Sequence, residues 1–333
     1  MAVVKADGFG HGLADVTRTA LANGATWLGA TSISEAVAVR EVERNAPVLS
    51  WLNPAVPDVE AAYRHRIDLA VPSVRHLDAI VATGRRLRVH LYLDTGLARD
   101  GASPDEWPLL VDAARQAHAA GRIEVVGVMG HLAMADRPGH PTNTTGRLEL
   151  LRAVDMAEQA GLRPVVRHLA ATAATLTDPA THLDMVRIGI GLVGFDPSGS
   201  TCLRSALRLT APVVQVRHVL AGTGVGYGHT YRTEGPSTLA LLPVGYADGV
   251  PRSASGRASV LIDGRRRRIA GVISMDQTVV DLGPDPVELG AQAVVFGPGT
   301  DGEPTVEEWA AWSGTIPHEI VTGIGPRVRR DVR

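Results

Sequence analysis

The sequence predicts an α/β protein, a (β/α)8 TIM-type barrel followed by a mostly antiparallel β domain. The chain has 333 residues, which is enough for two domains with sizeable cores. Over the first two-thirds, short apolar runs alternate with segments of helical spacing, and the last third consists mostly of strand-like segments separated by turn residues. These observations predict a barrel domain over 1–202 and a β domain over 203–333.

Eight apolar runs are candidate barrel strands. Strands that are buried on both faces form continuous apolar runs, and their alternation with helices is typical of a parallel sheet. The segments 105–120 and 145–160 have the spacing of helices. By pattern alone, an open doubly wound sheet is the alternative. The candidate strands are 2–5, 26–31, 48–52, 69–71, 88–95, 125–132, 165–170 and 185–193.

The pattern changes near residue 203. One segment there, 305–312, is predicted to be a helix, with Thr305 as its N-cap and Glu308 completing a capping box. The four arginines at 265–268 are expected at the solvated tip of a hairpin between two strands. The candidate strands of this domain are 213–220, 238–245, 258–263, 269–275, 278–282 and 293–297.

Composition excludes several functional classes. The 33 basic and 35 acidic residues give a net charge of −2 without a charged tail, so neither nucleic-acid nor membrane binding is expected. Cys202 is the single cysteine, which indicates a reducing compartment. No segment is long and apolar enough to span a bilayer, and no signal peptide is recognisable, so a cytoplasmic location is expected. Metal-binding signatures are lacking, and no metal is expected.

Lys5 is the only lysine, whereas the other basic residues are all arginine. The richness in Ala, Val, Gly and Arg is typical of GC-rich coding, under which surface lysines tend to be replaced by arginine. A remaining lysine is then a candidate for chemistry that arginine cannot perform. An ε-amine can lose its proton and attack a carbonyl, whereas a guanidinium cannot.

Polar residues follow several of the predicted barrel strands. Active sites of such barrels lie at the C-terminal ends of the strands, and the loops after strands seven and eight often bind phosphate. An amine on strand one and an anion cradle on strands seven and eight suit an aldehyde cofactor that carries a phosphate. The residues at this rim are Lys5, Asp94, Thr95, Arg99, His131, His168 and Arg187, with Thr172, Gly189 and Ile190 as the cradle.

Eight motifs along the whole chain resemble those of barrel-fold alanine racemases, in the same order. Together, the lysine motif, GYADG and MDQ make the resemblance highly specific. The motifs are AVVKADGFGHG at 2–12, LDTGLARDG at 93–101, GHLAMAD at 130–136, MVRIGIGLVG at 185–194, GYGHTYR at 226–232, PVGYADGVPR at 243–252, GVISMDQ at 271–277 and HEIVTGIGPRV at 318–328.

The resemblance implies racemisation of L- and D-alanine for peptidoglycan by two bases. Lys5 resembles the lysine that holds pyridoxal 5'-phosphate, and Tyr246 resembles the second base. Racemisation removes a proton from one face of Cα and delivers one to the other, which two groups on opposite faces achieve most simply. Free lysine and tyrosine titrate near pH 10, so both need perturbed environments.

The resemblance also implies roles for the residues around these two bases. In this family the tyrosine and the MDQ segment enter the active site from the second subunit, so a homodimer with composite sites is implied. By resemblance, His131 packs on the cofactor ring, Arg187 pairs with the pyridine nitrogen and is buttressed by His168, Thr172, Gly189 and Ile190 hold the phosphate, Arg99 and Met275 contact the substrate carboxylate, and Asp276 supports the MDQ segment.

The sequence departs from the family pattern at several positions. The chain begins four residues before Lys5, whereas the family carries a strand and a helix there. Phe9 replaces a tyrosine that reaches the phosphate, and Ala171 replaces an asparagine beside Thr172. Val193 replaces a frequent tyrosine, and Tyr92 lies where some members have a carbamylated lysine. Two alternatives therefore remain open: a racemase of another small amino acid such as serine, or a catalytically weak cofactor-binding paralogue.

The lost phosphate contacts predict weakened but retained affinity for pyridoxal phosphate. A hydrogen bond to a charged group contributes about 1.5–3 kcal/mol, and about 1.4 kcal/mol corresponds to tenfold in affinity. Phe9→Tyr is therefore expected to tighten cofactor binding by about tenfold or more, measured by spectroscopic titration of the cofactor-free protein. Tight binding that Phe9→Tyr leaves unchanged would contradict this interpretation.

Overall fold

The computed structural model describes residues 1–332, which form two compact units. The first unit comprises Met1–Gly8 and Gly12–Leu203. The second comprises Phe9–His11 and the chain from Arg204 onward. Each unit has its own sheet, and the two are described separately below.

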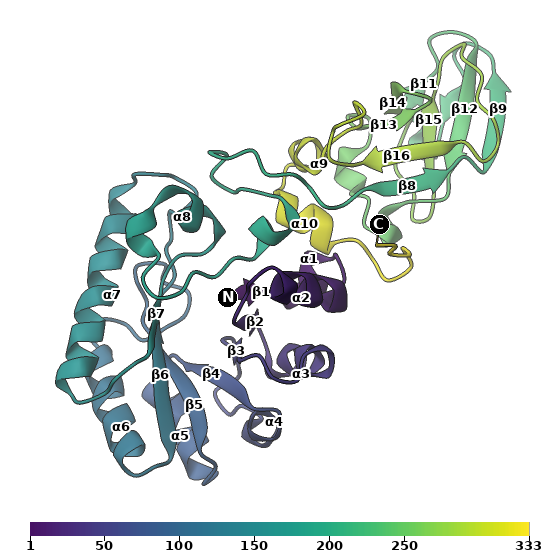
Figure 1. Cartoon of the computed structure of the whole chain (residues 1–333). Coiled ribbons are helices and arrows are strands. Elements are labelled where there is room, and N and C mark those ends of the chain that lie inside the picture. Colours follow the sequence, from purple (N-terminus) through teal and green to yellow (C-terminus); the bar gives the residue numbers. More distant parts are fainter. Residues whose placement is uncertain (333) are drawn as a thin grey trace. The chain divides into compact units, whose positions relative to one another are not determined.

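The first unit is built on a curved sheet of seven parallel strands in sequential order, with helices on its outer side (Figure 1). This arrangement confirms the predicted α/β barrel class. The strands are β1 (Ala2–Val3), β2 (Leu28–Ala30), β3 (Val48–Ser50), β4 (Ile67–Val71), β5 (Leu87–Tyr92), β6 (Ile123–Met129) and β7 (Val166–His168). The helices are α1 (Lys5–Phe9), α2 (Leu13–Ala22), α3 (Ile33–Val42), α4 (Val59–Arg64), α5 (Val74–Ala82), α6 (Trp107–Ala119), α7 (Pro141–Gln159) and α8 (Thr172–Thr177), with the 3-10 turns η1 (Pro179–Thr181) and η2 (Ile190–Val193).

The eighth predicted strand, 185–193, is reduced to a single bridge between Ala2 and Ile188. The segment still bonds to both sides, because Ile188 N–H donates to Met1 O at 3.0 Å and Arg187 N–H donates to Ala170 O at 2.9 Å. Beyond it, the backbone of Gly189 turns away from extended geometry (φ −114°, ψ −96°) and leads into η2. Glycines favour such a turn over a continued strand.

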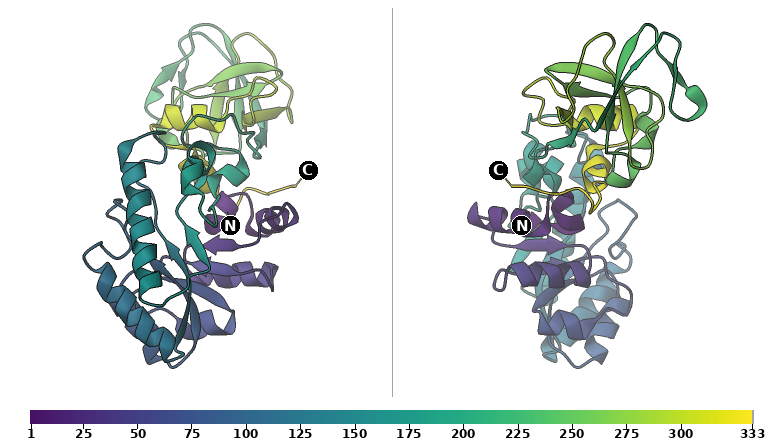
Figure 2. Two further views of the ribbon diagram at one scale, coloured as in Figure 1. Left: turned by 60° about the vertical axis from the view of Figure 1, so that its left-hand side comes forward. Right: turned by 90° about the vertical axis from the view of Figure 1, so that its right-hand side faces the viewer.

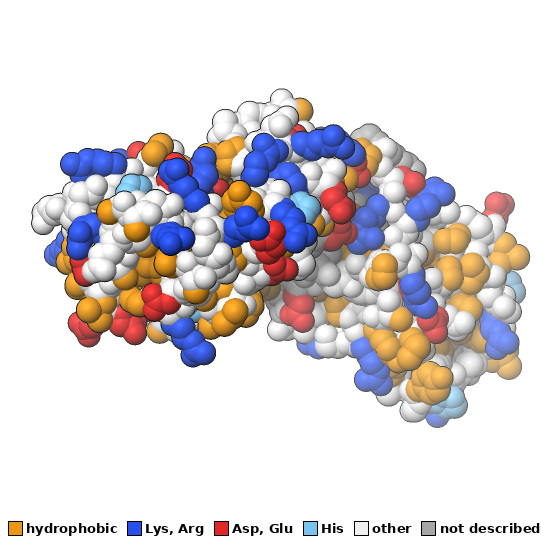
Figure 3. Space-filling model, turned by 90° about the horizontal axis from the view of Figure 1, so that it is seen from below, with side chains coloured by type: hydrophobic (Ala, Val, Ile, Leu, Met, Phe, Trp, Pro, Cys, Tyr) orange, Lys and Arg blue, Asp and Glu red, His pale blue; other side chains and the backbone are white. Residues whose placement is uncertain are grey.

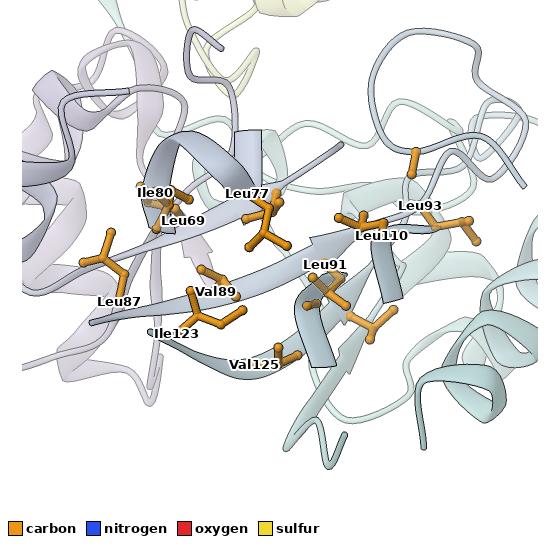
Figure 4. Packing of buried hydrophobic residues seen from close by; sticks show 14 of the residues in the cluster. Leu69, Leu77, Ile80, Leu87, Val89, Leu91, Leu93, Leu110, Ile123 and Val125 are labelled. Carbon is orange, nitrogen blue, oxygen red and sulfur yellow. The ribbon is translucent and has the colours of Figure 1, made fainter. Parts of the chain in front are cut away.

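Strand β5 separates an apolar layer from a polar interior because successive side chains of a strand point to opposite faces. Leu87, Val89 and Leu91 pack against the helices that cover the sheet, as Figure 4 shows. The residues between them, Arg88, His90 and Tyr92, therefore point to the opposite face. This alternation places polar groups inside the barrel while the outer layer stays apolar.

The second unit contains an antiparallel sheet in the order β8-β16-β13-β14-β15-β12-β9. In both views of Figure 2, the yellow helices α9 and α10 lie beside its green strands. The elements are β8 (Leu209–Pro212), β9 (Gln215–Val219), β10 (Gly224–Val225), β11 (Tyr231–Arg232), β12 (Ser237–Leu242), β13 (Ser259–Ile262), β14 (Arg265–Ile269), β15 (Thr278–Asp281), β16 (Gln292–Phe296), α9 (Val306–Ser313) and α10 (Pro317–Thr322), with the 3-10 turns η3 (Tyr227–His229), η4 (Tyr246–Asp248) and η5 (Arg252–Ala254).

The prediction that the four arginines at 265–268 lie at the tip of a hairpin is wrong. It forms strand β14, and the hairpin tip is Asp263–Gly264, where both residues have positive φ (47° and 72°). Long arginine stems can cover a sheet while their charged heads reach acidic partners at its edge. Arg267 pairs with Asp285, and Arg266 pairs with Glu308. Because β14 ends at Ile269, the predicted strand 269–275 is wrong beyond that residue.

The capping box predicted for helix α9 is confirmed. Thr305 Oγ1 accepts from Glu308 N–H at 3.2 Å, and the Glu308 carboxylate accepts from Thr305 N–H at 2.9 Å. Among the described residues, none of the helices is long and apolar enough to cross a membrane. On the face shown in Figure 3, basic side chains are interspersed with acidic and apolar ones rather than gathered in one patch.

Candidate active site

Lys5 follows strand β1 at the start of a left-handed helical turn. Ala6, Asp7 and Gly8 have φ values of 50°, 54° and 62°, and Phe9 continues the turn at 56°. Each non-glycine residue in this conformation costs about 1–2 kcal/mol, so the turn needs outside support. Leu13 N–H provides part of it by donating to the Asp7 carboxylate at 2.8 Å. The glycine-rich run was the signal for an unusual loop, but the sequence did not predict its hand.

The environment of Lys5 favours a neutral amine. Burial is the main cause that lowers the pKa of Lys5, and the positive charge of Arg99 acts in the same direction. Glu35 opposes both effects. Its carboxylate is fixed between Ala6 N–H and Thr31 N–H, each at 2.8 Å. Sequence reasoning missed Glu35, which lies within α3 as an ordinary helix glutamate.

Arg99 lies exposed on the loop after strand β5. Asp94 shapes this loop, because its carboxylate accepts hydrogen bonds from the backbone N–H groups of residues 96–98. Burial raises the pKa of Tyr92, and the nearby Arg99 acts in the opposite direction. A neutral tyrosine thus lies near Arg99 at the position where the family resemblance pointed to a carbamylated lysine.

Arg187 lies buried inside the barrel with its guanidinium surrounded by acceptors. Its Nη2 donates to Gly130 O at 2.7 Å, to Leu169 O at 3.1 Å and to His131 Nδ1 at 3.1 Å. Its Nη1 donates to His168 Nδ1 at 3.0 Å and to His168 O at 2.9 Å. Burial lowers the pKa of Arg187 to about 10, which leaves it a cation at neutral pH. Its Nε donates to no residue that the structure describes.

Two histidines beside Arg187 are held neutral. Burial and the charge of Arg187 lower the pKa of His131 to about 3, with smaller contributions from Arg99 and Lys5. The same two causes lower the pKa of His168 well below its ordinary value. Since arginine can only donate, each ring accepts through Nδ1. Because the charges of Arg187, Arg99 and Lys5 all lower the pKa of His131, these four side chains lie close to one another.

The predicted anion cradle lies at the start of helix α8 and of η2. Thr172 Oγ1 accepts from Gly189 N–H at 3.3 Å and from Gly191 N–H at 3.2 Å. A Cβ on Gly191 would lie 2.6 Å from Thr172 Cγ2, so only glycine allows this approach. Gly191 was not among the predicted residues, although the GIG repeat at 189–191 was its signal.

Tyr246 and Met275 lie together in the second unit, both substantially exposed, at 41% and 52%. Tyr246 N–H donates to Ser274 O at 3.1 Å, and Ala247 N–H donates to Met275 O at 3.0 Å. Gly245 permits this contact, because a Cβ there would lie 2.2 Å from Ser274 O. The predicted Asp276 forms an ion pair with Arg327, which also binds Asp248 of the GYADG motif.

The predicted residues therefore form two groups. The first unit carries the amine, the buried arginine, the two histidines and the anion cradle, and the second carries the exposed tyrosine, Met275 and Asp276. A reactive amine and an anion cradle at the rim of a parallel barrel suit an enzyme that handles a phosphorylated carbonyl compound.

Comparisons with known proteins agree with this class. Residues 1–197 match the family model "Alanine racemase, N-terminal domain", and residues 206–332 match "Alanine racemase, C-terminal domain". The chain is 49% identical over 341 residues to an alanine racemase from Frankia casuarinae, with 99% of this chain and 88% of the relative covered. It is 49% identical over 332 residues to one from Salinispora arenicola, covering 98% and 89%.

Solved structures agree as well. Alanine racemase from Streptomyces coelicolor superposes with a TM-score of 0.95 at 46% identity, covering 99% of this chain and 90% of that one. Alanine racemase from the D-cycloserine producer Streptomyces lavendulae gives 0.94 at 44% identity, covering 99% and 89%. These relatives are all racemases, so the chain is an enzyme of the isomerase class. It belongs to the alanine racemase family.

The residues present fit pyridoxal phosphate. Lys5 supplies an amine with a lowered pKa, and the Nε of Arg187 is a donor without an acceptor among the described residues. The neutral ring of His131 contacts the same arginine. The Thr172 hydroxyl is a neutral donor of the kind that binds phosphate, and the N–H groups of Gly189 and Gly191 hold its oxygen in place, which leaves its proton free to point to an anion.

The low pKa of His131 predicts a pH-dependent stability. Between about pH 6.5 and about pH 3 the unfolded chain binds a proton on this histidine that the folded chain does not bind. The free energy of unfolding should therefore fall as the pH falls through this window, with a contribution from His131 of up to about 1.4 kcal/mol per pH unit. His131→Asn should flatten the dependence in urea unfolding between pH 7 and pH 4.

The exposed His229 provides the control, because asparagine tolerates its positive φ of 46°. His229→Asn should retain the full slope. An unchanged slope in His131→Asn would show that His131 titrates normally in the folded protein.

Proposed function

We propose that the protein interconverts L- and D-alanine with pyridoxal 5'-phosphate by a two-base mechanism, in the cytoplasm, and supplies D-alanine for peptidoglycan. The family membership supports the reaction. The observation that carries the mechanism is Lys5, the one lysine of the chain, whose pKa is lowered by burial and by Arg99 beside a neutral His131 and a buried Arg187.

Pyridoxal phosphate, when bound, supplies an aldehyde that links covalently to amines and a ring that withdraws electrons from Cα. Lys5 would hold this cofactor through its ε-amine, and the free amine would move a proton at one face of the substrate Cα. Tyr246 moves a proton at the opposite face through its hydroxyl. The lowered pKa of Lys5 suits a base that works near neutral pH.

Arg187 and His131 set the electronic environment of the cofactor. Arg187 would offer its Nε proton to the pyridine nitrogen, and it would keep that proton at neutral pH because its pKa of about 10 lies well above 7. A ring nitrogen that accepts without being protonated is a weaker electron sink, which disfavours side reactions such as transamination. His131 packs on the ring in its neutral form.

Arg99 and Met275 hold the substrate carboxylate, and the Thr172, Gly189 and Ile190 segment holds the cofactor phosphate. Tyr246 and Met275 belong to the second unit and are substantially exposed. We therefore assign them to the active site of a partner subunit in a homodimer with two composite sites. Exposed functional side chains of this kind need a second surface to become part of a closed site.

Exchange of the substrate Cα proton tests the two-base mechanism. In deuterated water with pyridoxal phosphate and L-alanine, the protein should exchange the Cα proton and form D-alanine, followed by NMR and chiral chromatography. Tyr246→Phe should abolish racemisation by at least about a thousandfold while Lys5 still exchanges the Cα proton of one enantiomer. Lys5→Arg should lose both.

The remaining outcomes distinguish the alternatives. Cofactor binding without exchange would indicate a binding paralogue, and faster exchange with serine than with alanine would change the substrate. Equal racemisation by Tyr246→Phe and the unaltered protein would exclude Tyr246 as a base.

A mixing experiment tests the composite site. Lys5→Ala and Tyr246→Phe subunits are each expected to be inactive as homodimers. In a mixed dimer, one site combines both defects and the other regains Lys5 and Tyr246, so random mixing should restore about a quarter of the unaltered activity. Activity assayed after dissociation and reassociation of the two variants measures this, and no recovery would place both residues in one subunit's site.

A further inference from the structure

A chain of buried polar groups runs through the barrel from Arg187. Arg187 Nη1 lies 3.0 Å from His168 Nδ1, and His168 Nε2 lies 2.9 Å from His90 Nδ1. On the far side of its ring, His90 Nε2 faces Asp68 Oδ2 at 3.7 Å, and Asp68 Oδ1 pairs with Arg88 Nε at 3.2 Å. Arg187 and Asp68 at the two ends are buried, and the two histidines between them are fully inaccessible to solvent.

The fold provides the path of this chain. His90 lies on β5 and His168 on β7, so strand β6 lies between them. Gly127 of β6 is the residue paired with His90, and a Cβ there would lie 2.2 Å from His90 Nδ1. The missing side chain is what lets the two imidazoles meet across a strand, with their ring planes at 83°. Trp27 contacts the other side of His90, edge to face.

The hydrogen bonds in this chain have a fixed direction. Arginine can only donate, so His168 accepts at Nδ1 and, being neutral, carries its proton on Nε2. That proton is donated to His90 Nδ1, which leaves the proton of neutral His90 on Nε2, directed at Asp68. Burial lowers the pKa of both rings and so supports the neutral forms. Each histidine is thereby limited to one tautomer.

Asp68 ends the chain with a carboxylate oxygen that needs a donor. Its Oδ2 and His90 Nε2 are buried, and neither has a hydrogen-bond partner among the described residues. Their 3.7 Å separation is an attraction between a carboxylate and an N–H rather than a formed hydrogen bond. Asp68 also borders a pocket of about 330 Å³ that is lined by Arg40, Arg66, Arg86 and Arg88.

We propose that Asp68 and His90 are positioning residues for Arg187, which fix the tautomer of His168 and thereby the hydrogen bonds that orient the guanidinium. The proposal rests on the proposed function, in which Arg187 donates to the cofactor. Neither residue touches the reacting atoms. Their effect reaches the site through the attraction between the Asp68 carboxylate and the His90 N–H, and then through the direction of the hydrogen bonds from His90 to Arg187.

Substituting Asp68 by asparagine reverses that direction. Arg88 Nε can only donate, so the asparagine oxygen must face Arg88 and its NH2 group must face His90. His90 Nε2 then has to accept, its proton moves to Nδ1, and His168 is driven to carry its proton on the nitrogen that faces Arg187. Arg187 loses an acceptor and meets an N–H instead.

The first test uses the unaltered protein and needs no activity. Nitrogen-15 NMR of histidine-labelled protein distinguishes protonated from unprotonated ring nitrogens. We expect unprotonated Nδ1 and protonated Nε2 in both His90 and His168, with and without cofactor. The opposite tautomer in either ring would overturn the proposal, whether or not the protein proves to be a racemase.

The second test compares Asp68→Asn with Asp184→Asn. Asp184 forms an ion pair with Arg167 at 2.7 Å in the same unit, but it is not one of the buried polar groups that connect Asp68 to Arg187. Its substitution therefore controls for the removal of a carboxylate. Asp68→Asn should move the His90 and His168 protons, shift the absorbance of the bound cofactor and lower kcat by about tenfold to a hundredfold with KM changed less than about twofold, the scale known for the hydrogen-bond partners of metal-binding histidines.

Asp184→Asn should leave the tautomers, the absorbance and kcat near those of the unaltered protein. Equal behaviour of the two variants would overturn the proposal. If Asp68→Asn does not fold, Asp68→Ala, which removes the acceptor that faces His90 Nε2, takes its place with the same readouts. Absence of racemase activity in the unaltered protein would contradict the proposed function, and the NMR result would still decide the direction of the hydrogen bonds.

Discussion

The guanidinium of Arg187 inside the barrel is the interaction on which the rest of the site depends. Moving an isolated cation out of water is costly unless its donors are satisfied. Here three backbone carbonyls and two imidazole nitrogens accept from Nη1 and Nη2. The arrangement has a strict requirement, because an imidazole that accepts from arginine must be neutral at that nitrogen. The buried cation therefore requires an unprotonated Nδ1 in both His131 and His168, and whatever fixes the proton of each ring also governs how the guanidinium is held.

The barrel accommodates this polar interior because its strands keep their two faces separate. Strand β5 presents Leu87, Val89 and Leu91 to the helices and turns Arg88 and His90 inward. The same alternation on β4 buries Ile67 and Leu69 on one face and leaves Asp68 on the other. Polar side chains on the inner face of the sheet therefore leave the apolar packing of its outer face undisturbed, provided that each finds a hydrogen-bonding or ion-pair partner across the barrel interior.

Much of the architecture could be predicted from apolar patterning. The seven runs that became strands are mostly buried, and their alternation with helical segments indicated a parallel sheet. The eighth run failed because Gly189 and Gly191 interrupt it, and the arginine run failed because charge suggested a turn where long stems allow a strand. The capping box at Thr305 was predictable because it depends only on local hydrogen bonds.

The site was predictable in its residue types rather than in its geometry. Lys5, Arg187 and Tyr246 were recognisable by motif, whereas Glu35, His90 and Asp68 carry no local signal. Their roles depend on contacts between residues distant in the chain, such as the 2.9 Å contact between His90 and His168 across Gly127. The left-handed turn after Lys5 was equally hidden, because three of its four residues are not glycine.

The proposed function depends first on the attachment of the cofactor to Lys5. The most direct measurement is borohydride reduction of the protein loaded with pyridoxal phosphate, followed by peptide mass spectrometry. The chain has one lysine, so the only other primary amine is the α-amine of its first residue. We expect one cofactor-derived mass increment per chain, on the ε-amine of Lys5. An increment on the α-amine alone, or none in a protein that racemises alanine, would contradict it.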